Sequence, residues 1–160
     1  MTDASHPYPA ALQDIITLFE NLPETERREM LVTYAENSAK WGPTADETFD
    51  LEDVRKDEEC TDTVGIYLKA GKDDDGQPTA SFKVSLGHEV QTLTRAMTSI
   101  LCRGLNGSTL QAILDVPADF VPKIVGADLV RQRSQTVYYV LTRMKSAAKV
   151  YQNRLRQEAS

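Results

Sequence analysis

The chain has 160 residues, a length that suits one domain with a substantial hydrophobic core. Its apolar fraction of 41% and charged fraction of 26% are ordinary for a globular protein in water, and its formal net charge of −6 argues against nucleic acid or an anionic membrane as the main partner. No apolar run reaches the length of a bilayer span, and residues 1–10 lack the basic and apolar regions of a secretory signal. We therefore expect a cytoplasmic protein that does not act at a membrane.

Two helices are predicted near the start of the chain. Apolar residues recur at helical spacing over residues 11–22. A proline followed by acidic residues then opens a second helical segment over 23–41. Residues 1–10 are expected to form a flexible N-terminal tail, and a single domain is expected over residues 11–157.

The middle of the chain predicts a loop and then a hairpin. Residues 44–62 are mostly polar and acidic and are expected to form a long surface loop, a feature that is uncommon in compact domains and often functional. β-Branched and aromatic residues alternate in part over 63–70 and 79–86, which predicts two strands. The charged stretch GKDDDGQP between them is typical of an exposed turn.

The second half of the chain predicts further helices. A strong apolar period marks a helix over 89–105, and Ser108 is expected to cap a short helix after it. Residues 117–126 are expected to add a short helical piece, and residues 134–157 a long helix with Ser134 as its N-cap. Helices, then a small antiparallel sheet, then helices again define an α+β fold.

Charge is distributed unevenly along the chain. Residues 46–75 hold twelve acidic and four basic side chains, whereas residues 131–160 hold seven basic and one acidic. Runs of this kind are most often a solvated surface. The alternative is an acidic docking face near Cys60 that meets a basic surface of a partner.

The two cysteines lie in contrasting surroundings. Cys102 falls within the apolar stretch SILCRGL and is expected to be an inert core residue. Cys60 lies in DEECTDTV, among four carboxylates, near the end of the predicted loop and just before a strand. From residue types alone, Cys60 is either an incidental thiol or a functional one.

The chemistry open to Cys60 is limited. A cysteine hydrolase needs a base beside its thiol, and neither His6 in the tail nor His88 before a helix clearly supplies one. The chain has no C-x-x-C pair for dithiol chemistry and no zinc-site spacing, so no metal site is expected. A single loop cysteine can accept a group by thiol exchange and pass it on, which requires reach more than a catalytic base.

Four stretches of the chain follow one another in a specific order. They are LQDIITLFENLPETERREMLVTYAENSAKW, EDVRKDEECTDTVGIYL, ILCRGLNGSTLQAILDVPADF and LVRQRSQTVYYVLTRMKSAAK. Each stretch alone is weak, but together they span about residues 11–150 and resemble the SufE/CsdE family of sulfur-acceptor proteins of iron–sulfur cluster assembly. The resemblance implies an α+β fold with a small antiparallel sheet packed against helices, related to the IscU scaffold proteins.

The resemblance also implies a function. Cys60 would accept sulfur from the persulfide of a PLP-dependent cysteine desulfurase of the SufS/CsdA kind, stimulate that enzyme, and pass the sulfur to a SufBCD-like scaffold. The chain would then not be an enzyme itself, and it would need no cofactor because PLP belongs to the desulfurase.

The resemblance singles out one further residue. The arginine at the start of the family's last long helix matches Arg133, which is expected to stabilise the thiolate or persulfide of Cys60 or to contact the partner. An exposed arginine without such a role is the alternative. The acidic turn of some relatives is replaced here by His88 and Glu89.

Two rival functions remain open. One is a noncatalytic adaptor that regulates a desulfurase, and the other is a cysteine-dependent hydrolase or transferase. A further hypothesis concerns reactivity: the carboxylates around Cys60, together with partial burial, raise the pKa of its thiol and keep it unreactive until a partner docks.

Overall fold

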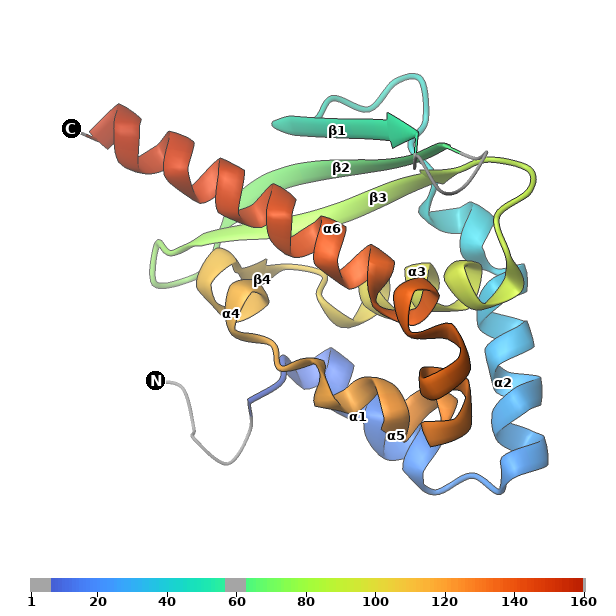
Figure 1. The fold of residues 1–160 in the computed structure, drawn as a ribbon. Coiled ribbons are helices and arrows are strands. Elements are labelled where there is room, and N and C mark those ends of the chain that lie inside the picture. Colours follow the sequence, from blue (N-terminus) through green and yellow to red (C-terminus); the bar gives the residue numbers. More distant parts are fainter. Residues whose placement is uncertain (1–6, 57–62, 160) are drawn as a thin grey trace.

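The computed structural model describes residues 7–56 and 63–159, which form a sheet with helices packed on one side (Figure 1). In chain order the elements are α1 (Ala10–Glu20), α2 (Glu24–Glu36), the 3-10 helix η1 (Ser38–Trp41), β1 (Leu51–Lys56), β2 (Thr63–Lys72), β3 (Pro78–Leu86), α3 (Thr92–Gly104), β4 (Ser108–Thr109), α4 (Leu110–Asp115), the 3-10 helix η2 (Ala118–Phe120), α5 (Val121–Val125) and α6 (Ala127–Ala159). The α+β class expected from the sequence is confirmed.

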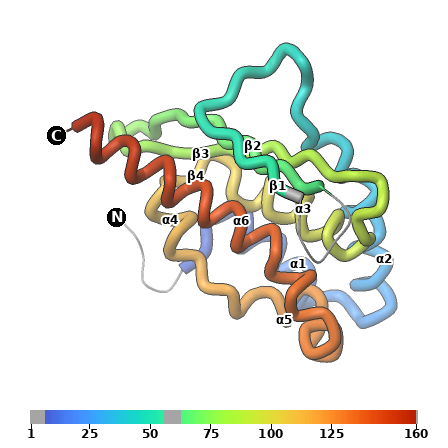
Figure 2. The backbone as a smooth tube through the Cα atoms, turned by 45° about the horizontal axis from the view of Figure 1, so that its top comes forward, coloured from blue at the N-terminus to red at the C-terminus, as the bar shows by residue number. Residues whose placement is uncertain are grey.

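The described strands form one antiparallel sheet in the order β1-β2-β3-β4. The long β2–β3 hairpin is the one predicted, and its register pairs Val64 with Leu86 and Leu68 with Phe82. Alternate residues of both strands are buried against the helices, as the period of a strand requires. Figure 2 shows α6 running along the sheet, with α4 next to β4 and both α4 and α5 in contact with α6.

The first strand of the sheet, β1, corrects the prediction of a continuous loop over residues 44–62. Residues 51–56 pair with β2 instead, from Leu51 opposite Leu68 to Lys56 opposite Thr63. Of the β1 side chains that are described, only that of Leu51 is buried. An edge strand commonly carries charged residues, which protect its free side from pairing with other chains. Those charges also hide the apolar alternation by which a strand is predicted.

Helix α3 lies at the centre of the hydrophobic core and contacts α1, α2 and α6. The residues that mark its helical period in the sequence, among them Met97, Ile100 and Leu101, are buried. The largest fully buried side chains of the core are Leu12, Ile16, Phe19, Ile66, Leu68, Met97, Ile100, Leu101, Leu105, Leu110, Ile113 and Phe120.

Helices α1 and α3 cross closely at Gly104. A Cβ atom on residue 104 would lie 2.9 Å from the Cδ1 and 3.1 Å from the Cα of Leu12. The Gly104→Ala variant is therefore expected to lower the free energy of unfolding by about 1–3 kcal/mol, because the backbone of α1 cannot yield as a side-chain tip can. Urea denaturation measures this change. The matched control is Gly42→Ala, where the nearest atom would be 3.4 Å away, and an equal loss in both variants would contradict the prediction.

The last helix consists of two helical stretches that meet at a kink. Helix α6 begins at Ala127, and Arg133 has non-helical backbone angles (φ −133°, ψ 36°) that mark a kink. A second helical stretch therefore begins at residue 134, as the prediction of a helix over 134–157 requires, and residues 127–132 form a first stretch before it. The residue with non-helical angles at this start is Arg133, so Arg133 rather than Ser134 holds the N-cap position. Beyond the kink, Val137, Leu141 and other apolar residues are buried as their spacing predicted.

Two smaller expectations also change. Thr109, rather than Ser108, caps α4, since its hydroxyl accepts a hydrogen bond from the amide of Ala112 at 3.1 Å. Within the expected tail, Tyr8 is only 8% exposed, its ring stacks edge-on against Phe120, and its hydroxyl donates a hydrogen bond to Asp119. The folded body therefore begins before residue 11.

Across the described residues, every helix is too short or too polar to cross a membrane.

Candidate functional site

The segment that carries Cys60 joins two paired strand ends. Lys56 ends β1, Thr63 begins β2, and the two are opposite each other in the antiparallel register. Cys60 itself lies in 57–62, outside the described residues, so its role stays a prediction. The structure does define how the two flanking strands are held.

A buried arginine holds these strands to α6. Arg143 is 4% exposed, and its guanidinium donates hydrogen bonds to the backbone carbonyls of Asp53 at 2.7 Å and of Val64 at 3.0 Å. It also reaches the Asp53 carboxylate at 3.3 Å and the Tyr139 hydroxyl at 2.8 Å. One side chain thus links β1, β2 and α6 within a few residues of the 57–62 segment.

The Asp53 carboxylate is shared between two arginines. Arg55 binds both of its oxygens, through Nε at 3.0 Å and Nη2 at 2.8 Å, and Arg143 approaches it from α6. Partial burial opposes ionisation of Asp53, but hydrogen bonds and charges from Arg55 and Arg143 outweigh it and lower the pKa of the carboxyl. The carboxylate therefore stays charged at neutral pH.

Sequence reasoning missed Arg143, although a signal was present. Arg143 lies three residues after Val140 and four before Ala147, both of which are buried on the inner face of α6. A charged residue at a buried position of a helix needs a partner, because an unpaired buried charge is costly. That pattern predicts a buried ion pair.

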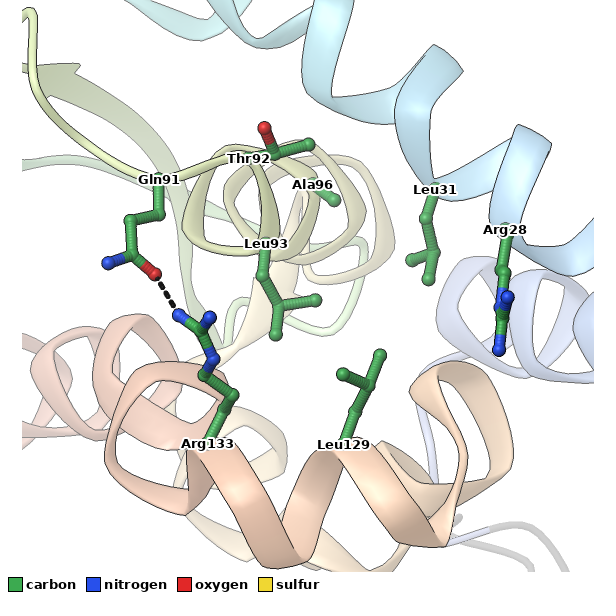
Figure 3. A pocket seen from close by; sticks show the side chains of 8 residues that line it. All are labelled: Arg28, Leu31, Gln91, Thr92, Leu93, Ala96, Leu129 and Arg133. Atoms are coloured by element: carbon green, nitrogen blue, oxygen red, sulfur yellow. Dashed lines mark hydrogen bonds between the residues drawn. The ribbon is translucent and has the colours of Figure 1, made fainter.

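The predicted site residue Arg133 lies at the kink of α6 and is exposed (Figure 3). Its Nη1 donates a hydrogen bond of 2.6 Å to Oε1 of Gln91, in the segment that leads into α3. Within residues 7–56 and 63–159, no carboxylate forms an ion pair with Arg133. Its position relative to Cys60 lies outside the described residues.

The His88 and Glu89 positions fall in the turn between β3 and α3. Arg95 fixes this turn by donating to the carbonyls of Gly87 at 2.8 Å and Val90 at 3.0 Å. His88 is exposed there.

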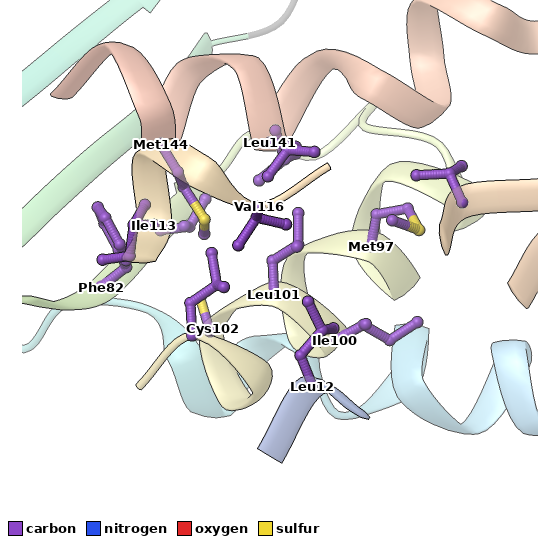
Figure 4. Close-up of a cluster of buried hydrophobic side chains, with 14 of the residues drawn as sticks. Leu12, Phe82, Met97, Ile100, Leu101, Cys102, Ile113, Val116, Leu141 and Met144 are labelled. Atoms are coloured by element: carbon purple, nitrogen blue, oxygen red, sulfur yellow. The ribbon is translucent and has the colours of Figure 1, made fainter. Parts of the chain in front are cut away.

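Cys102 is fully buried in α3, within the cluster drawn in Figure 4. Burial raises the pKa of its thiol to about 12, so almost none of it is thiolate at neutral pH. The core position predicted for Cys102 is confirmed, and its inert role stays a prediction.

The burial of Cys102 is expected to protect its thiol from alkylation. Iodoacetamide at pH 8 is expected to leave Cys102 unmodified in the native protein and to alkylate it after denaturation, because only the thiolate reacts. Peptide mass mapping of both samples measures this difference. Rapid modification of Cys102 without denaturant would contradict the buried position.

The protein is an α+β chain in which Cys102 lies in the core and Cys60 lies, in sequence, between the paired strand ends Lys56 and Thr63. A solved structure with this fold is the solution structure of a hypothetical protein from Thermus thermophilus, at 22% identity and a TM-score of 0.59, covering 89% of this chain and 96% of that one. At that identity the likeness concerns the fold alone. A search of curated proteins gives no match.

The family follows from the sequence. The family model SufE, described as an Fe-S metabolism associated domain, matches residues 13–148. The chain therefore belongs to the SufE family and has a role in iron–sulfur metabolism.

Proposed function

We propose that the chain accepts sulfur from a cysteine desulfurase on Cys60, stimulates that enzyme, and delivers the sulfur to an iron–sulfur cluster scaffold. The observation that carries the proposal is the SufE family match over residues 13–148, which includes Cys60. The position of Cys60 between the paired residues Lys56 and Thr63 supports it, because a thiol at a hairpin end can be presented to another protein.

The proposed transfer is a thiol exchange. The Cys60 thiolate attacks the outer sulfur of the desulfurase persulfide, the sulfur–sulfur bond of the donor breaks, and the donor leaves as a thiolate. Cys60 then holds the persulfide until a scaffold thiol repeats the exchange. PLP chemistry takes place on the desulfurase, so the chain acts as a partner and not as an enzyme in its own right.

Arg133 is the proposed electrostatic helper. A guanidinium stabilises a nearby thiolate or persulfide anion, and Arg133 is exposed and hydrogen-bonded to a neutral amide. The same exposure suits contact with the partner.

The test is to incubate the chain with its desulfurase and L-cysteine. We expect intact mass spectrometry to find one added sulfur atom on the chain and the rate of alanine release to rise. Stimulation without any added sulfur would favour the noncatalytic adaptor. Hydrolysis or group transfer in the absence of a desulfurase would favour the cysteine-dependent enzyme.

A further inference from the structure

A hollow of about 390 Å³ opens on the surface between α2, α3 and α6 (Figure 3). Leu31, Leu93, Ala96 and Leu129 form its apolar wall, and Arg28 and Arg133 stand at its rim. Its volume is within the range of sites that bind ligands. We call it the α2–α3–α6 hollow.

Both arginines of the rim are bound to partners that are themselves exposed, Glu24 and Gln91. Arg28 pairs with Glu24 at 2.7 Å, but both side chains are 74% exposed, and such a pair contributes little and exchanges partners readily. Arg133 donates to a neutral amide. Two guanidinium groups beside an apolar wall, on a chain of net charge −6, indicate a local preference for anions.

The positions of the two arginines and the leucines indicate the size and chemistry of a ligand that would fit the hollow. In Figure 3, Arg28 and Arg133 lie on opposite sides of the hollow, and Leu93 and Leu129 point into the space between them. A small anion would engage one arginine and leave the leucines exposed. A ligand that engages both must cross the apolar wall, which suits an extended peptide with an apolar side chain between two carboxylates.

We propose that the α2–α3–α6 hollow docks such an acidic–apolar segment of the sulfur-donating desulfurase. This inference rests on the proposed function and adds to it a recognition site built from α2, α3 and the first turns of α6. In this site Arg28 is a specificity-determining residue that touches no reacting atom.

The first experiment measures docking through the kinetics of stimulation. Arg28→Gln is expected to raise the concentration of the chain that gives half-maximal desulfurase stimulation about fivefold, with the maximum unchanged, because a charged contact is lost from binding alone. The matched control is Arg156→Gln, an exposed arginine at the far end of α6, which is expected to change neither value. If both variants give half-maximal stimulation at the same concentration as the wild type, the docking role of the hollow is wrong. The proposed sulfur transfer is then unaffected, because the wild type still accepts sulfur.

The second experiment needs no desulfurase. A capped synthetic peptide of sequence Gly-Glu-Leu-Glu-Gly is expected to shift the amide resonances of Leu93, Ala96 and Leu129, and its Gln-Leu-Gln counterpart to shift them far less. If the wild type accepts no sulfur but the peptide binds here, the proposed function fails and the hollow stands as a peptide site. Absence of shifts, or equal shifts with free glutarate, would overturn a peptide as the occupant.

Discussion

Cys60→Ser is expected to abolish sulfur transfer to the chain, whereas Cys102→Ala is expected to leave it intact. A hydroxyl is a much weaker nucleophile than a thiolate and cannot hold a persulfide. Cys102 is fully buried and its thiol pKa is about 12, so it can neither meet a partner nor ionise at neutral pH.

The measurement is the intact mass of each variant after incubation with the desulfurase and L-cysteine. We expect one added sulfur atom on the wild type and on Cys102→Ala, and none on Cys60→Ser. Sulfur that remains on Cys60→Ser but disappears from Cys102→Ala would reverse the assignment of the two cysteines. Alanine release measured in the same samples shows whether stimulation depends on the transfer.

Arg143→Met is expected to lower the free energy of unfolding by about 3 kcal/mol, the cost of breaking a buried, hydrogen-bonded ion pair. Methionine retains the apolar stem but leaves the carbonyls of Asp53 and Val64 without the donor they now have. Urea denaturation measures the loss. Arg55→Met is the matched control, since Arg55 binds the same carboxylate but is 56% exposed, and its loss is expected to cost under about 1 kcal/mol.

The stabilisation by the ion pair between Arg143 and Asp53 is expected to depend on pH. The folded pKa of Asp53 is lowered, so its contribution is complete above the unfolded pKa, near pH 4, and is lost as the pH falls through the folded pKa. The difference in stability between wild type and Arg143→Met is therefore expected to be smaller at pH 3 than at pH 7. A difference that grows on acidification would contradict the role given to Asp53.

Much of the fold was predictable because local patterns coincide with the core. The helix over 89–105 and the hairpin over 63–70 and 79–86 bury the faces that their periods indicate. The strand over 51–56 was missed because it is an edge strand whose charges obscure alternation. The kink at Arg133 has no proline or glycine to signal it.

The site was less predictable than the fold. Cys60 and Arg133 were found by resemblance to a family, and their proposed roles remain predictions. The partners of Arg143 and the wall of the α2–α3–α6 hollow come from elements far apart in the chain. No local pattern encodes such contacts, because they depend on how the helices pack on the sheet.

The pairing of Lys56 with Thr63 sets the range of any sulfur carried at position 60. Three peptide units separate Cys60 from Thr63, so its Cα can travel no more than about 11 Å from that anchor in any conformation. Cys60 therefore cannot carry a sulfur atom between two sites that are far apart while the rest of the chain stays in place. Under the proposed function, donor and recipient must each approach the end of the sheet to which Cys60 is tethered.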